Sequence, residues 1–358
     1  MAHIVIDTCA GREAGREALE AAALVSLERS HQITAVGDEA SVTAALGRIA
    51  HDAEHLRVAH APDHVDLDAD PAQAAARSPR SSIAVGLELL ARDPQAIFIS
   101  AGAPGLLVAT AQSTLGRIPG SSRAALAAVY PTLRPHGPAS DPFALLLDVG
   151  ATVSCSADDL VCFAAMGAAY AAKISRIDRP RVALLSNGTA MTGAPSRVRD
   201  AHRRLLQSTP GFEYVGCLRA DHVTSGDADV IVTDGFTGDV LLRTLEGVAA
   251  TGETLIKRAA ERFQWRLGVQ MLGDGIAAIR EFTDWENYGG APLLGLDRAV
   301  IVTQANSGRR AFVNAIRLGA KFDRLQVLQA VAAGVAELTS RPSEPETQTA
   351  QSDAQEPA

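Results

Sequence analysis

The chain has 358 residues, which is enough for two lobes that each bury a core. Its formal net charge of −8 at pH 7 argues against a nucleic-acid-binding protein, because binding to a phosphate backbone requires a basic excess. Aromatic residues make up only 4% of the chain, so the core must consist of aliphatic side chains, which suits helices packed on a parallel sheet. The apolar runs all fall short of the roughly 18 residues that a membrane-spanning helix needs.

The cysteines and the N-terminus indicate the compartment. Cys9, Cys155, Cys162 and Cys217 are scattered without a Cys-x-x-Cys pair. This spacing indicates neither a zinc site nor a disulfide framework, so we expect a reducing environment and no bound metal. The segment Met1–Asp7 reads as a strand instead of a secretory signal. We therefore expect a cytoplasmic protein.

Short apolar runs alternate with longer stretches of helical period, which is typical of βαβ units. The expected strands are Ile4–Ile6, Ile33–Val36, Ala96–Ser100, Ala144–Asp148, Val182–Leu185, Phe212–Gly216, Val230–Thr233 and Val300–Thr303. The expected helices are Gly15–Ser30, Ser82–Arg92, Asp159–Ile174, Ser196–Gln207, Asp239–Arg262 and Ala311–Leu318. In an open parallel sheet, ligands bind beyond the carboxyl ends of the strands, so we expect the functional residues in the turns that follow these strands.

Two segments suggest how the chain divides. The stretch Arg134–Pro142 carries three prolines and is expected to connect two lobes. We expect a first α/β lobe from residues 1–148 and 296–338, and a second from residues 149–295. The tail 340–358 is rich in Pro, Glu, Gln, Thr and Ser and is expected to be disordered.

Two segments carry groups that bind anions. The turn Ser100–Gly105 follows a strand and opens a helix near Leu106, so its backbone N–H groups would face a phosphate. At Arg77–Ser82, two guanidinium groups lie beside hydroxyls at a helix N-cap, which also suits a phosphate or a carboxylate. Taken alone, the first segment is more readily a structural turn without a ligand, and the second is equally a solvated helix cap. The first turn lacks the GxGxxG pattern, so we expect no nicotinamide cofactor.

Two further segments are rich in glycine. In Asp234–Gly238 the flanking glycines allow a ligand to approach the backbone, and Asp234 places a carboxylate at a strand end. The alternative is a turn in which Phe236 is a hydrophobic plug. The run Tyr288–Gly295 cannot be the interior of a helix. It is either a loop that lines a cleft or a plain connector.

Short motifs follow one another in a specific order along the chain. They are SAG (100–102), LGRIPG (115–120), YPT (130–132), LLLDVGA (145–151), DGFTGDVLLRTLEG (234–247), YGGAPLLG (288–295) and NAIR (314–317), preceded by GDE (37–39) and the span 58–82. In this order they resemble the PlsX family of phosphate acyltransferases, from about Ile4 to Leu318. The resemblance implies the α/β fold of the isocitrate dehydrogenase and phosphotransacetylase group, with two α/β lobes around a cleft, and a homodimer.

The resemblance also implies a reaction and a set of site residues. Inorganic phosphate would attack the thioester of an acyl carrier protein (acyl-ACP) and give an acyl phosphate for phospholipid synthesis, with no cofactor and no metal. The residues that the resemblance marks as catalytic are Asp234 and Arg80. Those that it marks as substrate-binding are Ser81, Ser82, Ser100, Gly102, Gly105, Asn187, Gly235, Gly238, Gly289, Gly290, Asn306 and Ser307.

Several polar groups depart from the family pattern. Cys9–Arg12 stands where relatives carry Gly-Gly-Asp, and Ala103-Pro104 stands where they carry Asn-Thr. The turn Ser186–Ala190 lacks the acids of the family, and Gln304–Ser307 replaces a His-Gly-Ser-Ser turn. Two alternatives therefore stay open. One is a catalytically impaired paralogue that binds carrier protein, membrane or an enzyme partner, and the other is a short-chain phosphate acyltransferase.

Residues 254–272 carry apolar side chains at helical spacing, among them Ile256 and Met271, with Lys257 and Arg258 between them. A basic amphipathic helix of this kind is typical of a membrane-surface contact. The alternative is a dimer or core helix, which we favour because Gly268 is expected to interrupt the helix.

Overall fold

The structure is a computed structural model that describes residues 1–10, 12–63, 65, 70–137, 141–188, 193–207, 211–261, 263–275 and 285–339. The strands are β1 (His3–Asp7), β2 (Gln32–Gly37), β3 (Leu56–His60), β4 (Ala96–Ser100), β5 (Ala125–His136), β6 (Asp141–Leu147), β7 (Arg181–Ser186), β8 (Glu213–Arg219), β9 (Val230–Val232), β10 (Ala291–Leu294) and β11 (Ala299–Val302). The helices are α1 (Arg12–Ser26), α2 (Glu39–Leu46), α3 (Pro71–Arg77), α4 (Ser82–Arg92), α5 (Pro104–Thr114), α6 (Ala157–Ile174), α7 (Ser196–Gln207), α8 (Gly235–Ala260), α9 (Phe263–Met271), α11 (Arg309–Arg324) and α12 (Val327–Thr339), with 3₁₀ turns η2 (Ala220–His222) and η3 (Trp285–Tyr288).

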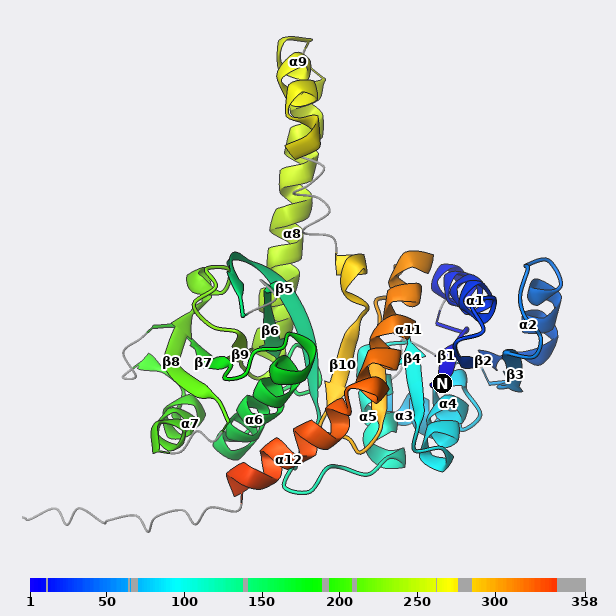
Figure 1. Ribbon diagram of the computed structural model, residues 1–358, viewed down its shortest axis with the longest axis horizontal. Helices are drawn as coiled ribbons and strands as arrows, with labels where there is room; N and C mark the ends of the chain where they lie inside the picture. Colours follow the sequence, from blue (N-terminus) through cyan, green and yellow to red (C-terminus); the bar gives the residue numbers. More distant parts are fainter. Residues whose placement is uncertain are drawn as a thin grey trace, which may run out of the picture.

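A single mixed sheet of eleven strands runs through the molecule in the order β3-β2-β1-β4-β11-β10-β5-β6-β9-β7-β8 (Figure 1). In one half β1, β2, β3, β4 and β11 are parallel, and in the other β6, β7, β8 and β9 are parallel. The antiparallel strands β10 and β5 join the halves through two residue pairs, Leu293 with Leu126 and Leu294 with Ala125. The lobe boundaries at residues 148 and 296 stay a prediction, because the sheet is continuous across them.

Helices cover both faces of the sheet, because alternate residues of each buried strand point to opposite faces. Along β1, Ile4 and Ile6 pack in one core cluster with Phe312 of α11, whereas Val5 packs in the other with Leu87 of α4. The first layer contains α1, α2, α6, α7, α11 and α12, and the second contains α3, α4 and α5. Helix α12 leaves the half that holds α11 and packs against α6 of the other half (Figure 1).

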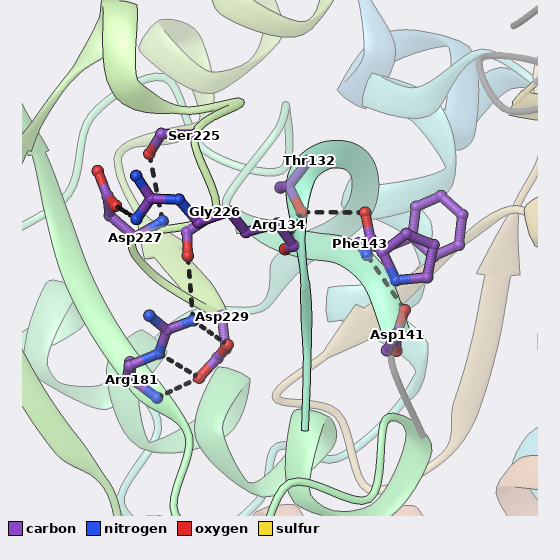
Figure 2. A network of polar contacts seen from close by, with 10 residues as sticks. Thr132, Arg134, Asp141, Phe143, Arg181, Ser225, Gly226, Asp227 and Asp229 are labelled. Atoms are coloured by element: carbon purple, nitrogen blue, oxygen red, sulfur yellow. Dashed lines mark hydrogen bonds and ion pairs between the residues drawn. The ribbon is translucent and has the colours of Figure 1, made fainter. Parts of the chain in front are cut away.

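The sequence predicts that the proline-rich stretch Arg134–Pro142 connects two lobes, and this prediction is wrong. Its described residues belong to the tip of the hairpin formed by β5 and β6. Residues 138–140 lie outside the described part of the chain. The Arg134 guanidinium donates to Asp227 at 3.0 Å, and the Arg181 guanidinium donates to Asp229 at 2.9 Å and to the Gly226 carbonyl at 3.1 Å (Figure 2). The bond from Arg134 fastens the hairpin to the loop before β9, and the bonds from Arg181 fasten the start of β7 to the same loop.

Each of the eight expected strands overlaps an observed strand, and each of the six expected helices overlaps an observed helix. Strands β3, β5 and β10 were not expected, nor were helices α2, α3 and α12. Helix α9 passes through Gly268, so the predicted interruption at this residue is wrong. The predicted disordered tail, residues 340–358, lies outside the described residues.

Helices α8 and α9 form an arm, drawn in yellow-green and yellow, that projects away from the sheet (Figure 1). In the described part of the chain, the helices are too short or too polar to cross a membrane.

Candidate functional site

A cavity of about 1200 Å³ lies where the carboxyl ends of β1, β4 and β11 meet the start of β5 and one face of α8. Much of its wall is apolar, with Ile83 and Leu106 on one side and Val129 and Leu242 on the other. This is the strand-end position that the sequence predicted for the first half of the sheet. A cavity of this size exceeds what phosphate alone needs and suits a larger, mainly apolar ligand.

The turn after β4 is organised by a hydrogen-bonded chain. The Ser100 hydroxyl donates to Asp7 at 2.6 Å and accepts from the Gly102 amide at 2.9 Å. We had expected the Gly102 amide to bind phosphate, but Ser100 already accepts its hydrogen bond. Gly102 lines the cavity, whereas Ser100 lies behind it and shapes the turn. Gly105 lies in the first turn of α5, where its amide has no partner within the helix.

The paired serines begin α4. Ser81 is the N-cap residue and accepts a hydrogen bond from the Ala84 amide at 3.3 Å, and Ser82 lines the cavity within hydrogen-bonding reach of Asp7. Arg80, the predicted cation, has an exposed side chain that does not line the cavity. Its amide donates to Asp63 at 2.8 Å, which fixes the backbone beside the serines.

The DGFTG segment forms the start of α8 and lies behind the cavity wall. Asp234 caps the helix through the Thr237 amide at 2.9 Å and pairs with Arg197 at 2.9 Å. Burial opposes ionisation of this carboxyl, but the bonds from Thr237 and Arg197 lower the pKa of Asp234 below its usual value. These contacts give Asp234 a structural role. It is not among the residues that line the cavity.

Gly235 and Gly238 allow close packing against the loop that follows β6. A Cβ atom on Gly235 would lie 2.6 Å from a carboxylate oxygen of Asp148, and one on Gly238 would overlap the Asp148 carbonyl. Asp148 accepts from the amides of Leu126, Gly150, Ala151 and Thr152 at 2.8–3.1 Å and so holds the loop in place. Val149 and Gly150 of this loop line the cavity. The two glycines therefore act on the cavity through the loop.

Some of the remaining predicted residues line the cavity, and the others lie outside its wall. Gly290 and Asn306 line the cavity. Gly289 packs on the backbone of Asn314, and the Ser307 hydroxyl accepts from the Gln304 amide at 3.0 Å. Asn187 follows β7, is exposed and donates to the Gly193 carbonyl at 3.2 Å. Of the fourteen predicted residues, the structure brings four to the cavity: Ser82, Gly102, Gly290 and Asn306.

Residues missed at the sequence level come from the cavity face of α8. Asp239, Arg243 and Glu246 repeat at helical spacing and line the cavity. Arg243 is the one basic side chain among the described lining residues, which include five carboxylates, those of Asp7, Glu13, Asp63, Asp239 and Glu246. Arg243 pairs with Asp239 at 2.8 Å, and Glu246 accepts from Gln304 at 3.0 Å. The DGFTGDVLLRTLEG motif contains these residues, but its sequence does not show which side of the helix faces the cavity.

The thiols offer no activated nucleophile. All four cysteines are free, and Cys9 lies in the cavity wall. Burial and the neighbouring Asp7 carboxylate raise the pKa of the Cys9 thiol. Burial raises the pKa of Cys155 to about 12 and that of Cys162 to about 11. Among the described residues, we find no group of three or more His, Cys, Asp or Glu side chains arranged to hold a metal ion.

Known proteins resemble the chain in sequence and in fold. The family model described as "Fatty acid synthesis protein" matches residues 2–330. A phosphate acyltransferase of Myxococcus xanthus is 37% identical over 317 residues, which cover 87% of this chain and 88% of the relative. A phosphate acyltransferase of Thermoanaerobacter pseudethanolicus is 36% identical over 270 residues, covering 75% and 79%.

A phosphotransacetylase from Streptococcus pyogenes has the same fold, with a TM-score of 0.58 at 17% identity over 93% of this chain and 94% of that chain. This similarity confirms the predicted fold class. The match to the family model over most of the chain, and the relatives above 30% identity, establish the family. The chain therefore belongs to the fatty acid synthesis protein family, which is the PlsX family whose motifs it carries, and it is an acyltransferase.

Proposed function

We propose that this acyltransferase moves a fatty acyl group from acyl carrier protein to inorganic phosphate and gives an acyl phosphate for phospholipid synthesis in the cytoplasm. The observation that carries the proposal is one cavity in which an apolar wall and, among the described lining residues, a single guanidinium occur together. The apolar wall suits the acyl chain, and Arg243 suits the phosphate, because a guanidinium can bind two phosphate oxygens at once.

The reaction needs no covalent enzyme intermediate. A phosphate oxygen attacks the thioester carbonyl carbon, the C–S bond breaks, and the thiolate leaves as the carrier-protein thiol after it takes up a proton. Phosphate is itself the nucleophile, which agrees with the raised pKa of the cavity thiol Cys9. The main work of the protein is to hold phosphate beside the thioester, where positioning lowers the barrier.

The proposed phosphate contact can be tested against the alternative at Arg80. Arg243→Ala should raise the apparent KM for phosphate about tenfold to a hundredfold, because a charge-assisted hydrogen bond is typically worth about 1.5–3 kcal/mol. Phosphate-dependent release of carrier protein from a long-chain acyl thioester measures this effect. Arg80→Ala, in the exposed turn outside the cavity, is the matched variant and should leave this KM nearly unchanged. If Arg80→Ala raised the KM for phosphate more than Arg243→Ala did, phosphate would bind beside the paired serines instead.

The alternative that the sequence left open is an impaired member of the family, which binds carrier protein without turnover. The five carboxylates around one guanidinium favour it, because they oppose the binding of a phosphate anion. The same assay separates the two, since a binding protein releases no carrier protein from any thioester. Acetyl- and butyryl-CoA, run beside the long-chain thioester, test for a short-chain enzyme.

We also propose a homodimer, formed through α8. Its exposed apolar side chains, Phe236, Val240, Val248 and Leu255, share a face of the helix other than the one lining the cavity.

At the far end of the arm Trp265, Met271 and Leu272 are exposed beyond the basic residues Lys257 and Arg258. The side chains of Phe263 and Leu267 lie outside the described residues. A membrane contact there is a further proposal, and co-flotation with anionic vesicles tests it; loss of binding in Met271→Glu supports it, and unchanged binding opposes it.

A further inference from the structure

Arg243 and Glu246 stand three residues apart on α8, and both line the cavity. Opposite charges at this spacing are neighbours on a helix surface and normally attract each other. A carboxylate bound to Arg243 would compete with phosphate for the same guanidinium. In the described residues, however, these two side chains form no ion pair.

Two other residues hold the pair apart. The side-chain amide of Gln304, in the loop after β11, donates to a Glu246 carboxylate oxygen at 3.0 Å. The backbone of Gln304 is itself fixed, because its amide donates to the Ser307 hydroxyl at 3.0 Å and its carbonyl accepts from the Ser307 amide at 2.9 Å. Arg243 is held from the opposite direction, with Nε bonded to the Asp239 carboxylate at 2.8–3.0 Å.

A phenol lies near Glu246, and the side chain that donates to Glu246 is uncharged. Tyr130 of β5 faces the same part of the cavity, and burial together with the Glu246 carboxylate raises the pKa of this phenol. Gln304 is neutral, so it satisfies the carboxylate without bringing a second cation that would bind phosphate elsewhere. Arg243 lines the cavity, and its bonds to Asp239 use only Nε, so Asp239 does not occupy the terminal nitrogens.

We infer that Gln304 is a positioning residue that draws Glu246 away from Arg243 and so keeps the guanidinium available for phosphate. This inference rests on the function proposed above and deepens it. It assigns to the loop after β11 a control over phosphate affinity, although Gln304 itself does not touch phosphate.

The test replaces Gln304 with Leu, which keeps the size of the side chain and removes the donor. In Gln304→Leu, Glu246 is free to pair with Arg243. The apparent KM for inorganic phosphate should therefore rise about twofold to fivefold, the range that a partly exposed ion pair is worth, while the KM for the acyl thioester stays unchanged. Adding Glu246→Gln to this variant should restore the phosphate KM, because the competing charge is gone. Gln329→Leu, on the exposed side of α12, is the matched control.

A rise in both KM values together, or a double variant that is not rescued, would overturn the inference. Turnover by the wild-type protein tests the proposed function separately. If the wild-type protein were inactive, the crystal structure of Gln304→Leu would still decide the point. A Glu246 carboxylate within 4 Å of the Arg243 guanidinium supports the positioning role, and an unmoved Glu246 refutes it.

Discussion

At the end of β1 the carboxylate of Asp7 is buried at the floor of the cavity, where it accepts from the Ser100 hydroxyl and from the Cys9 amide at 2.8 Å. Such hydrogen bonds do not replace all the water that a carboxylate loses on burial. Burial therefore raises the pKa of Asp7 above its ordinary value of 3.8, although the hydrogen bonds from Ser100, Cys9 and Ser82 oppose the shift. The residue organises the turn before α5 at a cost in folding free energy.

That cost depends on pH in a direction that can be measured. Between the ordinary pKa of 3.8 and the raised folded value, the folded protein holds a proton that the unfolded chain has lost. The contribution of Asp7 to stability therefore falls as the pH rises through this window. Asp7→Asn removes the titration, so the stability of this variant relative to wild type should rise with pH, by at most about 1.4 kcal/mol per pH unit. Urea unfolding of both proteins from pH 4 to pH 7 measures this, and a constant difference between them would contradict it.

Among the elements, α8 combines three roles that lie in different places along and around it. Asp234 caps its first turn, one face of its middle turns lines the cavity, and its far end reaches out with α9. The cap is the part that a substitution can isolate, because Asp234 has no contact with the cavity.

Asp234→Ala should lower the free energy of unfolding by about 1–2 kcal/mol, the usual cost of losing an N-cap, since Thr237 and Arg197 lose their partner. Thermal or urea unfolding measures the loss. Asp221→Ala removes an exposed carboxylate that pairs with Arg219, and it should cause no measurable change. Asp234→Asn keeps an acceptor for the Thr237 amide and should keep kcat. A large fall in kcat in this variant would make Asp234 catalytic after all.

The elements that the sequence predicted share a simple signal. Strands such as β1, β4 and β9 are buried on both faces, so they appear as continuous apolar runs between turn residues. Strand β5 contains Pro131, and β10 is a four-residue antiparallel strand that begins with Ala291-Pro292. Proline normally argues against a strand. The run that contains β10 was interpreted as a loop or connector and the end of β5 as part of a connector, while the rest of β5 was not predicted.

The site was predictable only where it depends on local turns. Ser82 and Gly102 were found because a helix cap and a strand-end turn have sequence patterns. Arg243 and Glu246 lie inside an amphipathic helix, and no local pattern states that their side faces a cavity. Gln304 lies near in space to Glu246 but 58 residues away in the chain. Only tertiary packing brings these groups together.

At the scale of the whole molecule, the arm leaves a large apolar surface uncovered in a single chain. Phe236, Val240, Val248 and Leu255 of α8 are all more than half exposed. An apolar face of this kind on a long helix normally packs against another helix. A second copy of α8 fits this requirement, because the small residues Gly247 and Thr251 on the exposed part of the helix permit close approach.

We therefore expect the wild-type protein to sediment as a dimer at micromolar concentration. Val248→Glu should shift it to the monomer, because two carboxylates would be buried at the interface. Leu206→Glu, on α7, adds the same charge at a similarly exposed position outside α8 and should leave the dimer intact. A monomeric wild-type protein, or a Val248→Glu variant that still dimerises, would be evidence against the α8 interface.

The position of β11 in the sheet has a consequence for synthesis on the ribosome. Strand β4 ends at Ser100, yet its partner β11 begins at Ala299, about 200 residues later. At roughly 5–20 residues per second, about 10–40 s separate the two strands as they are made. During that interval the backbone N–H and C=O groups on the edge of β4 that later pairs with β11 have no partner strand and are open to strands of other chains. The order of strands that places the cavity at the junction of the two halves thus exposes the nascent protein to aggregation before β11 emerges.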